Sequence, residues 1–260
     1  MKTNQTILQC ENISVNFGGF YAMTNFSFEI GYGELHFLIG PNGAGKTTFL
    51  DVLCGKTKNS KGTVLFKGEH DLSKLKEFEI VRKGIGRKFQ APSVFPHLTV
   101  YENLELARKQ DKSLWGILRA KTSPEQEQEI TEQLELIGLE EHRHTEASIL
   151  SHGQKQWLEI GMVMMQKPDL LLLDEPIAGM TEEEEEKTGE LLLKLKERCS
   201  IIVVEHDMEF VRKYAEKVTV MHEGSLLCDG AMEEVQTNER VMEVYLGRKG
   251  DEARVAITTA

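Results

Sequence analysis

The sequence has little of what marks a disulfide-stabilised or metal-binding protein. Among its 260 residues only four are cysteine, and aromatic residues make up 7%. Cys10, Cys54, Cys199 and Cys228 lie far apart, without C-x-x-C spacing or neighbouring pairs of histidines. That pattern indicates neither a zinc site nor a disulfide framework. We therefore expect reduced thiols, most of them buried.

Long apolar runs are also absent. The longest, around residues 170–173 and 201–204, are far shorter than the roughly 20 residues that a helix needs to cross a bilayer. Residues 1–10 are polar and lack the apolar centre of a signal peptide. Any membrane role must therefore run through a partner protein.

Positive charge is in short supply. The chain carries 31 Lys and Arg against 42 Asp and Glu, for a formal net charge of -11. Because neutralising phosphates needs clustered Lys and Arg, this balance argues against nucleic acid as a partner, and it disfavours adsorption to anionic lipid. With 40% hydrophobic and 28% charged residues, the composition is that of a packed globular protein. The length suits one large domain, or one domain with an inserted lobe.

The first third of the chain has the pattern of two kinds of strand. Residues 8–15 and 22–30 alternate apolar with polar side chains, which predicts an antiparallel sheet with one solvated face. Residues 35–39 are continuously apolar and are followed by a glycine-rich loop and a predicted helix over 47–54. This is the order strand, phosphate loop, helix. Further along we expect a strand over 62–66 and a helix over 72–83.

The middle of the chain is predominantly helical. The apolar spacing predicts helices over 100–109, 123–137 and 154–165, and Ser123 followed by Pro124 is typical of a helix start. We interpret this stretch as a helical lobe inserted into an α/β core.

Strand and helix alternate again after Pro168. We expect buried parallel strands over 170–173 and 201–204, and the remaining elements are a helix over 181–198, short strands over 218–221 and 225–228, and a helix over 242–246. The predicted organisation is an N-terminal part of the core with its antiparallel subdomain (1–90), a helical subdomain (91–165), a second part of the core (166–247) and a loose tail (248–260).

A complete phosphate-loop motif follows the strand over 35–39. It matches G-x-x-x-x-G-K-[ST] at Gly40, Pro41, Asn42, Gly43, Ala44, Gly45, Lys46 and Thr47, with Thr48 next. Glycines let successive N–H groups point at phosphate oxygens, and the helix N-terminus adds partial positive charge. We expect Lys46 to reach the β- and γ-phosphates and the Thr47 hydroxyl to bind Mg²⁺.

Acidic partners for that loop follow the buried strand of leucines. Asp174 lies at its C-terminal end, where α/β sheets bind ligands, and Glu175 and Pro176 come next. We expect Asp174 to hold magnesium through water and Glu175 to polarise the attacking water as a general base.

A short segment upstream of these acids carries a family resemblance. Leu150-Ser151-His152-Gly153-Gln154 resembles the signature sequence of ATP-binding cassette (ABC) ATPases, and the resemblance extends over about residues 8–247. It implies a P-loop NTPase fold of the ABC ATPase type: an α/β, RecA-like core with an antiparallel β subdomain and an inserted α-helical subdomain. It also implies that Ser151 and the Gly153 backbone bind the γ-phosphate of ATP held by a partner subunit.

The same resemblance assigns further residues. Gln90 occupies the place of a glutamine that joins core and lobe, contacts Mg²⁺ and the attacking water, and senses the membrane partner. His206 matches the switch histidine that touches the γ-phosphate, and Phe17 matches an aromatic residue that stacks on adenine. A phenylalanine buried in the core is the alternative for Phe17.

The sequence departs from the commonest family pattern at two positions. His152 stands where glycine is usual, and Thr181 stands where the loop after Pro176 often ends in aspartate. The glutamate run over 182–186 is interpreted as a solvated helix start favoured by the helix dipole.

The resemblance implies an ATPase subunit of a membrane importer. Its partners would be a second ATP-binding subunit, identical or a sister cassette, two permease subunits and indirectly a substrate-binding protein; its place would be the cytoplasmic face of the membrane. The signature region and residues 241–247 resemble the urea-type subunit most closely, while the branched-chain amino acid type shares much of the pattern. A DNA-acting ATPase of the same superfamily, a catalytically silent cassette and an exporter subunit are the alternatives.

Overall fold

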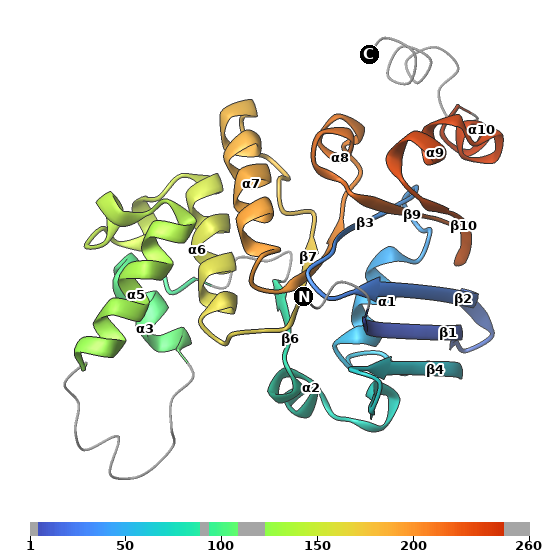
Figure 1. Ribbon diagram of the computed structural model, residues 1–260, viewed down its shortest axis with the longest axis horizontal. Helices are drawn as coiled ribbons and strands as arrows, with labels where there is room; N and C mark the ends of the chain where they lie inside the picture. The colour runs from blue at the N-terminus through green and yellow to red at the C-terminus, as the bar shows by residue number, and fades with distance from the viewer. Residues whose placement is uncertain (1–4, 89–93, 109–122, 247–260) are drawn as a thin grey trace.

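The computed structural model describes residues 5–88, 94–108 and 123–246. Figure 1 shows an antiparallel sheet on one side, a mixed sheet in the centre, and a group of helices on the side away from the antiparallel sheet. The phosphate loop lies between the two sheets, at the start of α1 (Lys46–Leu53).

The antiparallel sheet forms as the alternating pattern predicts. Its strands, in the order β2-β1-β4-β5, are β1 (Thr6–Phe17), β2 (Phe20–Gly31), β4 (Lys61–Phe66) and β5 (His70–Asp71). Along β2 the buried side chains of Phe26, Phe28 and Ile30 alternate with exposed polar ones. The apolar face packs on α1, where the rings of Phe26 and Phe49 meet edge to face with centroids 5.0 Å apart.

The central sheet contains the continuously apolar strands. Its order is β10-β9-β3-β8-β7-β6, with β3 (Leu35–Ile39), β6 (Ile85–Lys88), β7 (Leu170–Asp174), β8 (Ser200–Val204), β9 (Lys217–His222) and β10 (Ser225–Gly230). All neighbouring strands run parallel except β9 and β10. The predicted buried parallel pair, β7 and β8, is confirmed. The carboxyl ends of β3, β7 and β8 therefore lie at one edge, where sheets of this type bind ligands.

Helices cover the central sheet and build the lobe. They are α2 (Glu77–Lys83), α3 (Val100–Ala107), α5 (Pro124–Ile137), α6 (His152–Met164), α7 (Glu182–Leu195), α8 (Met208–Tyr214), α9 (Met232–Thr237) and α10 (Glu239–Leu246). Figure 1 shows α3, α5 and α6 as one group, with α7 between α6 and α8. Ser123, Ser151 and Thr181 cap the N-termini of α5, α6 and α7 with their side-chain oxygens, as expected of Ser and Thr before a helix.

The structure corrects several expected elements. The helix predicted over 72–83 is a 3₁₀ turn (Leu72–Lys74) followed by α2, because Leu75 and Lys76 between them adopt extended backbone angles. Strand β6 and helices α8 and α9 were not predicted from the sequence, because they are short and lack a clear apolar period, and the closing helix begins at Glu239 rather than at residue 242. The domain boundaries at 90, 165 and 247 remain predictions.

Two of the four thiols are deeply buried. Cys10 and Cys199 have little or no exposure, and Cys54 and Cys228 are half-buried. Burial raises the pKa of Cys10 and raises that of Cys199 to about 12, so both remain protonated thiols at neutral pH. Within the described ranges, no helix combines the length and the apolar character that crossing a bilayer requires.

Substitutions of two adjacent leucines in α7 test how this helix packs against the core. Leu192 is fully buried in an apolar cluster that includes residues of the central sheet and of the lobe, whereas Leu193 is 39% exposed. We expect Leu192→Ala to lower the free energy of unfolding by about 2–5 kcal/mol through lost contacts and a cavity. The matched control, Leu193→Ala, should stay within about 0.5 kcal/mol. Urea titration measures both, and equal effects would contradict the packing of α7.

Candidate functional site

The phosphate loop needs glycine at its two ends. Gly40 has a φ of 151°, and a Cβ there would lie 2.2 Å from the carbonyl oxygen of Met221. Gly45, the residue before α1, has a φ of 102° in the left-handed region. Glycine tolerates both conformations, whereas other residues do not. The backbone can therefore turn sharply and bring the amides of the loop together at the N-terminus of α1.

Lys46 is held inside the loop. Its side chain is 8% exposed, and Nζ donates hydrogen bonds to the carbonyl oxygens of Gly40 (2.6 Å) and Pro41 (3.2 Å). Burial lowers the pKa of Lys46, while the carboxylates of Glu175 and Asp174 act in the opposite direction. An anion bound by the loop would also favour the ammonium form, so this lysine is suited to phosphate.

A cavity of about 490 Å³ brings the loop together with other predicted residues. Its lining includes Phe17, Phe20, Ala22, Asn42, Gly43, Ala44, Gly45, Lys46, Thr47, Thr48 and Glu175. Phe17 is 53% exposed, so the alternative of a core phenylalanine is wrong. Phe20, which was not predicted from the sequence, is 70% exposed and lines the same cavity. The cavity thus joins exposed aromatic rings to an anion-binding loop.

The turn after β7 separates two adjacent carboxylates. Glu175 has a φ of 49°, and its N–H donates to the Val204 carbonyl oxygen of β8 at 2.9 Å. A glutamate in the left-handed region costs of order 1 kcal/mol, and such conformations cluster at functional sites. Asp174 points into the protein with 1% exposure, whereas Glu175 lines the cavity with its side chain about one-third exposed.

Asp174 is bound on one side only. Its Oδ2 lies 3.3 Å from a guanidinium nitrogen of Arg87, which also pairs with Asp51 at 2.6 Å. Among the residues that the structure describes, Asp174 Oδ1 is buried without a hydrogen-bond partner. Burial raises the pKa of Asp174, Arg87 opposes that rise, and Glu175 adds to it. The partnerless oxygen and the Thr47 hydroxyl are the hard oxygen ligands that Mg²⁺ prefers, so these residues fit that ion.

His206 faces Glu175 from the end of β8. Its Nδ1 lies 3.7 Å from Glu175 Oε1, and its side chain is 62% exposed. Behind it, the fully buried Glu205 carboxylate accepts hydrogen bonds from the N–H groups of His206 (3.1 Å) and Ile177 (3.3 Å). Glu205, absent from the sequence-based site, therefore ties the loop after Glu175 to the loop that carries His206. Its burial raises its pKa.

The signature residues lie at the start of α6, outside the cavity around Lys46. The Ser151 hydroxyl accepts a hydrogen bond from the Gln154 N–H at 3.1 Å and donates one to Glu184 Oε1 at 2.7 Å. His152 Nε2 lies 3.0 Å from the carbonyl oxygen of Ala178. A hydrogen bond to this carbonyl requires the proton on Nε2, and the side-chain nitrogen of Gln156 lies 3.2 Å from the same ring nitrogen. The histidine that departs from the family pattern thus binds the loop after Pro176 within the same chain.

The link between core and lobe is only partly described. Gln90 lies outside the described residues. Two residues before it, Lys88 at the end of β6 forms a buried pair with Glu159 of α6, with Nζ and Oε2 3.6 Å apart. Burial lowers the pKa of Lys88, and Glu159 opposes this. Neither residue belongs to a motif, so this pair could not be predicted from the sequence.

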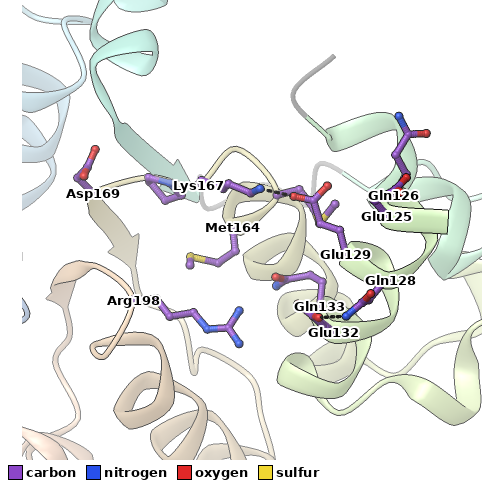
Figure 2. A pocket seen from close by; sticks show the side chains of 12 residues that line it. Glu125, Gln126, Gln128, Glu129, Glu132, Gln133, Met164, Lys167, Asp169 and Arg198 are labelled. Carbon is purple, nitrogen blue, oxygen red and sulfur yellow. Dashed lines mark hydrogen bonds and ion pairs between the residues drawn. The ribbon is translucent and has the colours of Figure 1, made fainter. Parts of the chain in front are cut away.

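A larger cavity, of about 620 Å³, lies elsewhere, between α5 and the start of β7 (Figure 2). Its polar side chains pair with one another: Lys167 Nζ lies 2.5 Å from Glu129 Oε1, and Gln128 donates to Glu132. It contains none of the residues predicted from the sequence and lies at the amino end of β7, opposite to the ligand-binding edge. We therefore place the candidate site at the phosphate loop.

Comparison with sequence families agrees with that geometry. A family described as "ABC transporter" matches residues 23–178, and one described as "Branched-chain amino acid ATP-binding cassette transporter" matches residues 225–251. The chain is similar to the high-affinity branched-chain amino acid transport ATP-binding protein LivG of Escherichia coli, at 35% identity over 253 residues, covering 94% of this chain and 99% of the relative. It is 32% identical to BraF of Pseudomonas aeruginosa, with the same coverage.

Solved structures show the same fold. The ADP conformation of MJ1267, an ATP-binding cassette of an ABC transporter, superposes with a TM-score of 0.80 at 31% identity, covering 94% of this chain and 100% of that one. The dimeric, post-hydrolysis cassette MJ0796 bound to ADP and Pi gives a TM-score of 0.71 at 26% identity, covering 86% and 98%. The fold is therefore the P-loop NTPase fold of an ABC ATPase cassette, as expected.

The raised pKa of Asp174 predicts how stability depends on pH. Because folding disfavours the ionised carboxylate, the stabilising contribution of this group is complete below its ordinary pKa of 3.8 and is lost as pH rises through the raised pKa of the folded state. Asp174→Asn should therefore raise the melting temperature of the nucleotide-free protein at pH 7 by about 2–4 °C. The gain should shrink towards pH 4.

The control for this prediction is Asp169→Asn. That carboxylate is 46% exposed and pairs with Lys67 at 2.7 Å, so its loss should leave the melting temperature the same or slightly lower. Thermal melts in EDTA at several pH values measure both variants. If the Asp174→Asn protein melts below the parent at pH 7, the buried ionised carboxylate does not destabilise the fold, and the prediction is wrong.

Proposed function

This chain belongs to the ABC transporter family as an ATP-binding, ATP-hydrolysing subunit, and we propose that it drives an importer of branched-chain amino acids. The observation that carries the ATPase part is the meeting of the phosphate loop, Glu175 and His206 at one edge of the central sheet. The cargo rests on the relatives and on the family matched by residues 225–251.

The cavity at the phosphate loop suits ATP. Backbone amides of the loop and the Lys46 ammonium would donate to the phosphates, with Lys46 exchanging the carbonyls of Gly40 and Pro41 for phosphate oxygens. Phe17 offers an exposed ring for adenine, and Phe20 widens that surface. Stacking on an aromatic ring suits any base, so the phosphates supply most of the recognition.

Thr47, Asp174 and Gln90 would hold Mg²⁺. When bound, the ion neutralises charge on the β- and γ-phosphates. Asp174 supplies the buried oxygen that has no partner within the described part of the chain, and Arg87 fixes the other oxygen of the same carboxylate. Arg87 is thus a positioning residue, because it orients Asp174 from behind through a guanidinium that also pairs with Asp51.

Glu175 would act as the general base. Its carboxylate faces the cavity, where it can take a proton from the water that attacks the γ-phosphorus while the bond to ADP breaks. His206, 3.7 Å from that carboxylate, would contact the γ-phosphate and keep Glu175 in place. The buried Glu205 fixes the backbone at His206 and at Ile177, so the two loops move together.

A second cassette would complete the site. Ser151, His152, Gly153 and Gln154 begin α6 in the lobe and do not line the cavity around Lys46. Figure 1 shows α6 and α1 on opposite sides of the central sheet, so the signature of this chain is placed to act on another molecule. The partner is an identical chain or a sister cassette.

The permeases would bind beside the lobe. An apolar cavity of about 300 Å³ lies between β6 and α6, and its lining includes Ile85, Gly86, Met162, Val163 and Pro168. The buried pair of Lys88 and Glu159 lines the same cavity and is electrostatically coupled to Asp174. A helix of a permease held here would place the chain at the cytoplasmic face of the membrane and connect its motion to the ATP site.

The comparisons favour branched-chain amino acids over urea as the cargo. The resemblance to a urea-type subunit, noted in the sequence, receives no support, whereas the relatives named above transport branched-chain amino acids. The family matched by residues 225–251 carries the same description. A substrate-binding protein would select the cargo. The DNA-acting alternative gains no support either, since these relatives are transport proteins.

Replacing the general base tests the ATPase mechanism. We expect Glu175→Gln to lower ATP turnover by at least about 100-fold, because the amide cannot take the proton, and to trap an ATP-bound dimer. Phosphate release and light scattering measure the two effects. Glu182→Gln removes the same charge from an exposed position on α7 and should leave both unchanged. Near-normal hydrolysis by Glu175→Gln would refute the mechanism.

Cargo and partners are tested together in native membranes. We expect the tagged chain to copurify with permeases, and the complex reconstituted with its binding protein to hydrolyse ATP severalfold faster with leucine, isoleucine or valine. Urea should have no effect, because the binding protein would not load it. Stimulation by urea alone would overturn the cargo, and copurification without any membrane protein would overturn the importer itself.

A further inference from the structure

The glutamate run at the start of α7 contains one residue that is not simply solvated. Glu184 accepts a hydrogen bond from the Ser151 hydroxyl (2.7 Å), and its carboxylate lies close enough to Gly153 of the signature for the N–H of that glycine to lower the carboxylate pKa. A third donor, the Thr181 N–H, lies 3.1 Å from its other oxygen. Figure 1 shows α6 and α7 side by side, and this contact joins their first turns. Residues 182–186 begin α7 as expected, but Glu184 is half-buried and hydrogen-bonded rather than freely solvated.

The hydroxyl of Ser151, which binds Glu184, and the Gly153 backbone, which the same carboxylate covers, are the groups that the family resemblance assigns to the γ-phosphate of a partner's ATP. We propose that Glu184 occupies the phosphate-binding donors of the signature in the separate subunit and must be displaced when the dimer closes on ATP. This inference rests on the proposed function, because it assumes that Ser151 and Gly153 act on the partner's nucleotide.

Glu184 and a phosphate oxygen cannot share these donors. A Cβ built on Gly153 would lie 2.5 Å from Glu184 Cδ, so the carboxylate lies directly against that glycine and keeps it buried. The hydrogen bond from Ser151 lowers the pKa of Glu184, which therefore stays ionised at neutral pH. Two anions in the same place would repel each other, and each would claim the same hydroxyl.

The contact would act in both directions of the ATP cycle. Before closure, a charge-assisted hydrogen bond orients the Ser151 hydroxyl and the same carboxylate covers Gly153, so ATP must compete with Glu184 at both residues. After hydrolysis and loss of phosphate, Glu184 recovers its donors, which favours reopening. The result is a threshold: dimers form only when the ATP site of the partner is well occupied.

Removing the carboxylate should leave the helices in place. His152 Nε2 donates to the Ala178 carbonyl oxygen at 3.0 Å, and Trp157 Nε1 donates to the Thr188 hydroxyl at 2.8 Å. Both contacts join α6 to α7 or its leading loop independently of Glu184. A glutamine at position 184 also keeps the shape and an acceptor for the Thr181 cap.

The test uses the full chain with Glu175→Gln, in which ATP-bound dimers accumulate. Adding Glu184→Gln should lower the ATP concentration that gives half-maximal dimerisation by about tenfold, because the charged competitor is gone. Glu182→Gln, an equal charge change on the same turn without a contact to the signature, is the matched control and should not shift it. Analytical ultracentrifugation at a series of ATP concentrations measures the shift.

A second measurement reports the contact itself. Hydrogen exchange of the Gly153 amide in the nucleotide-free monomer should accelerate about tenfold or more in Glu184→Ala and stay unchanged in Glu182→Ala. An unchanged or raised ATP requirement in Glu184→Gln would overturn the inference while leaving the proposed function intact. If the Glu175→Gln parent itself forms no ATP-dependent dimer, the proposed function fails first, and the inference with it.

Discussion

The parallel pairing of β3, β8 and β7 is the constraint on which the rest of the structure depends. It brings three carboxyl ends to one edge, although the loops that follow them are far apart in sequence. The phosphate loop follows β3, Glu175 follows β7, and His206 follows β8. A shift of one residue between these strands would turn Asp174 away from the core and Glu175 away from the cavity, because side chains alternate along a strand.

That edge is also where buried charge collects. Asp174, Glu205 and Glu159 have almost no exposure, and the cations that offset them, Lys88 and Arg87, are equally buried. Such groups cost stability unless each finds partners, and they are kept where they position reactive side chains. Here they connect the ATP-binding core to the lobe: Lys88 pairs with Glu159 of α6, and Glu205 binds backbone on both loops of the site.

Much of the site could be predicted because its motifs are local. A continuously apolar strand, a glycine loop and a helix, or an apolar strand ending in two acids, are each contained in one stretch of chain, so Lys46 and Glu175 could be placed without coordinates. What escaped prediction depends on residues distant in sequence. Arg87 and Asp51, like Ser151 and Glu184, come into contact only after folding, and their spacing in the sequence does not predict the contact.

Strand β6 and the contact of His152 could not be predicted either, because both depend on residues outside their own stretch of sequence. Strand β6 has only four residues, including a glycine and two basic side chains, and its place in the sheet is set by β7 rather than by its own pattern. His152 departs from the commonest signature, and the structure gives it a partner in the Ala178 carbonyl. The substitution therefore has a physical account that the sequence could not supply.

The turn between β9 and β10 has a consequence for how such cassettes diverge. Gly224 donates its N–H to the Ala44 carbonyl oxygen at 3.0 Å and accepts from Thr24 N–H at 2.9 Å, and the Met221 carbonyl lies against Gly40. The phosphate loop is thus hydrogen-bonded to the backbone of Gly224, which immediately precedes residues 225–251, the segment matched by the branched-chain family. Gly224 therefore joins this turn to the phosphate loop and to β2 through backbone hydrogen bonds. A chimera between importer types that replaced the turn would disturb the loop, whereas a junction after Gly224 would keep both bonds.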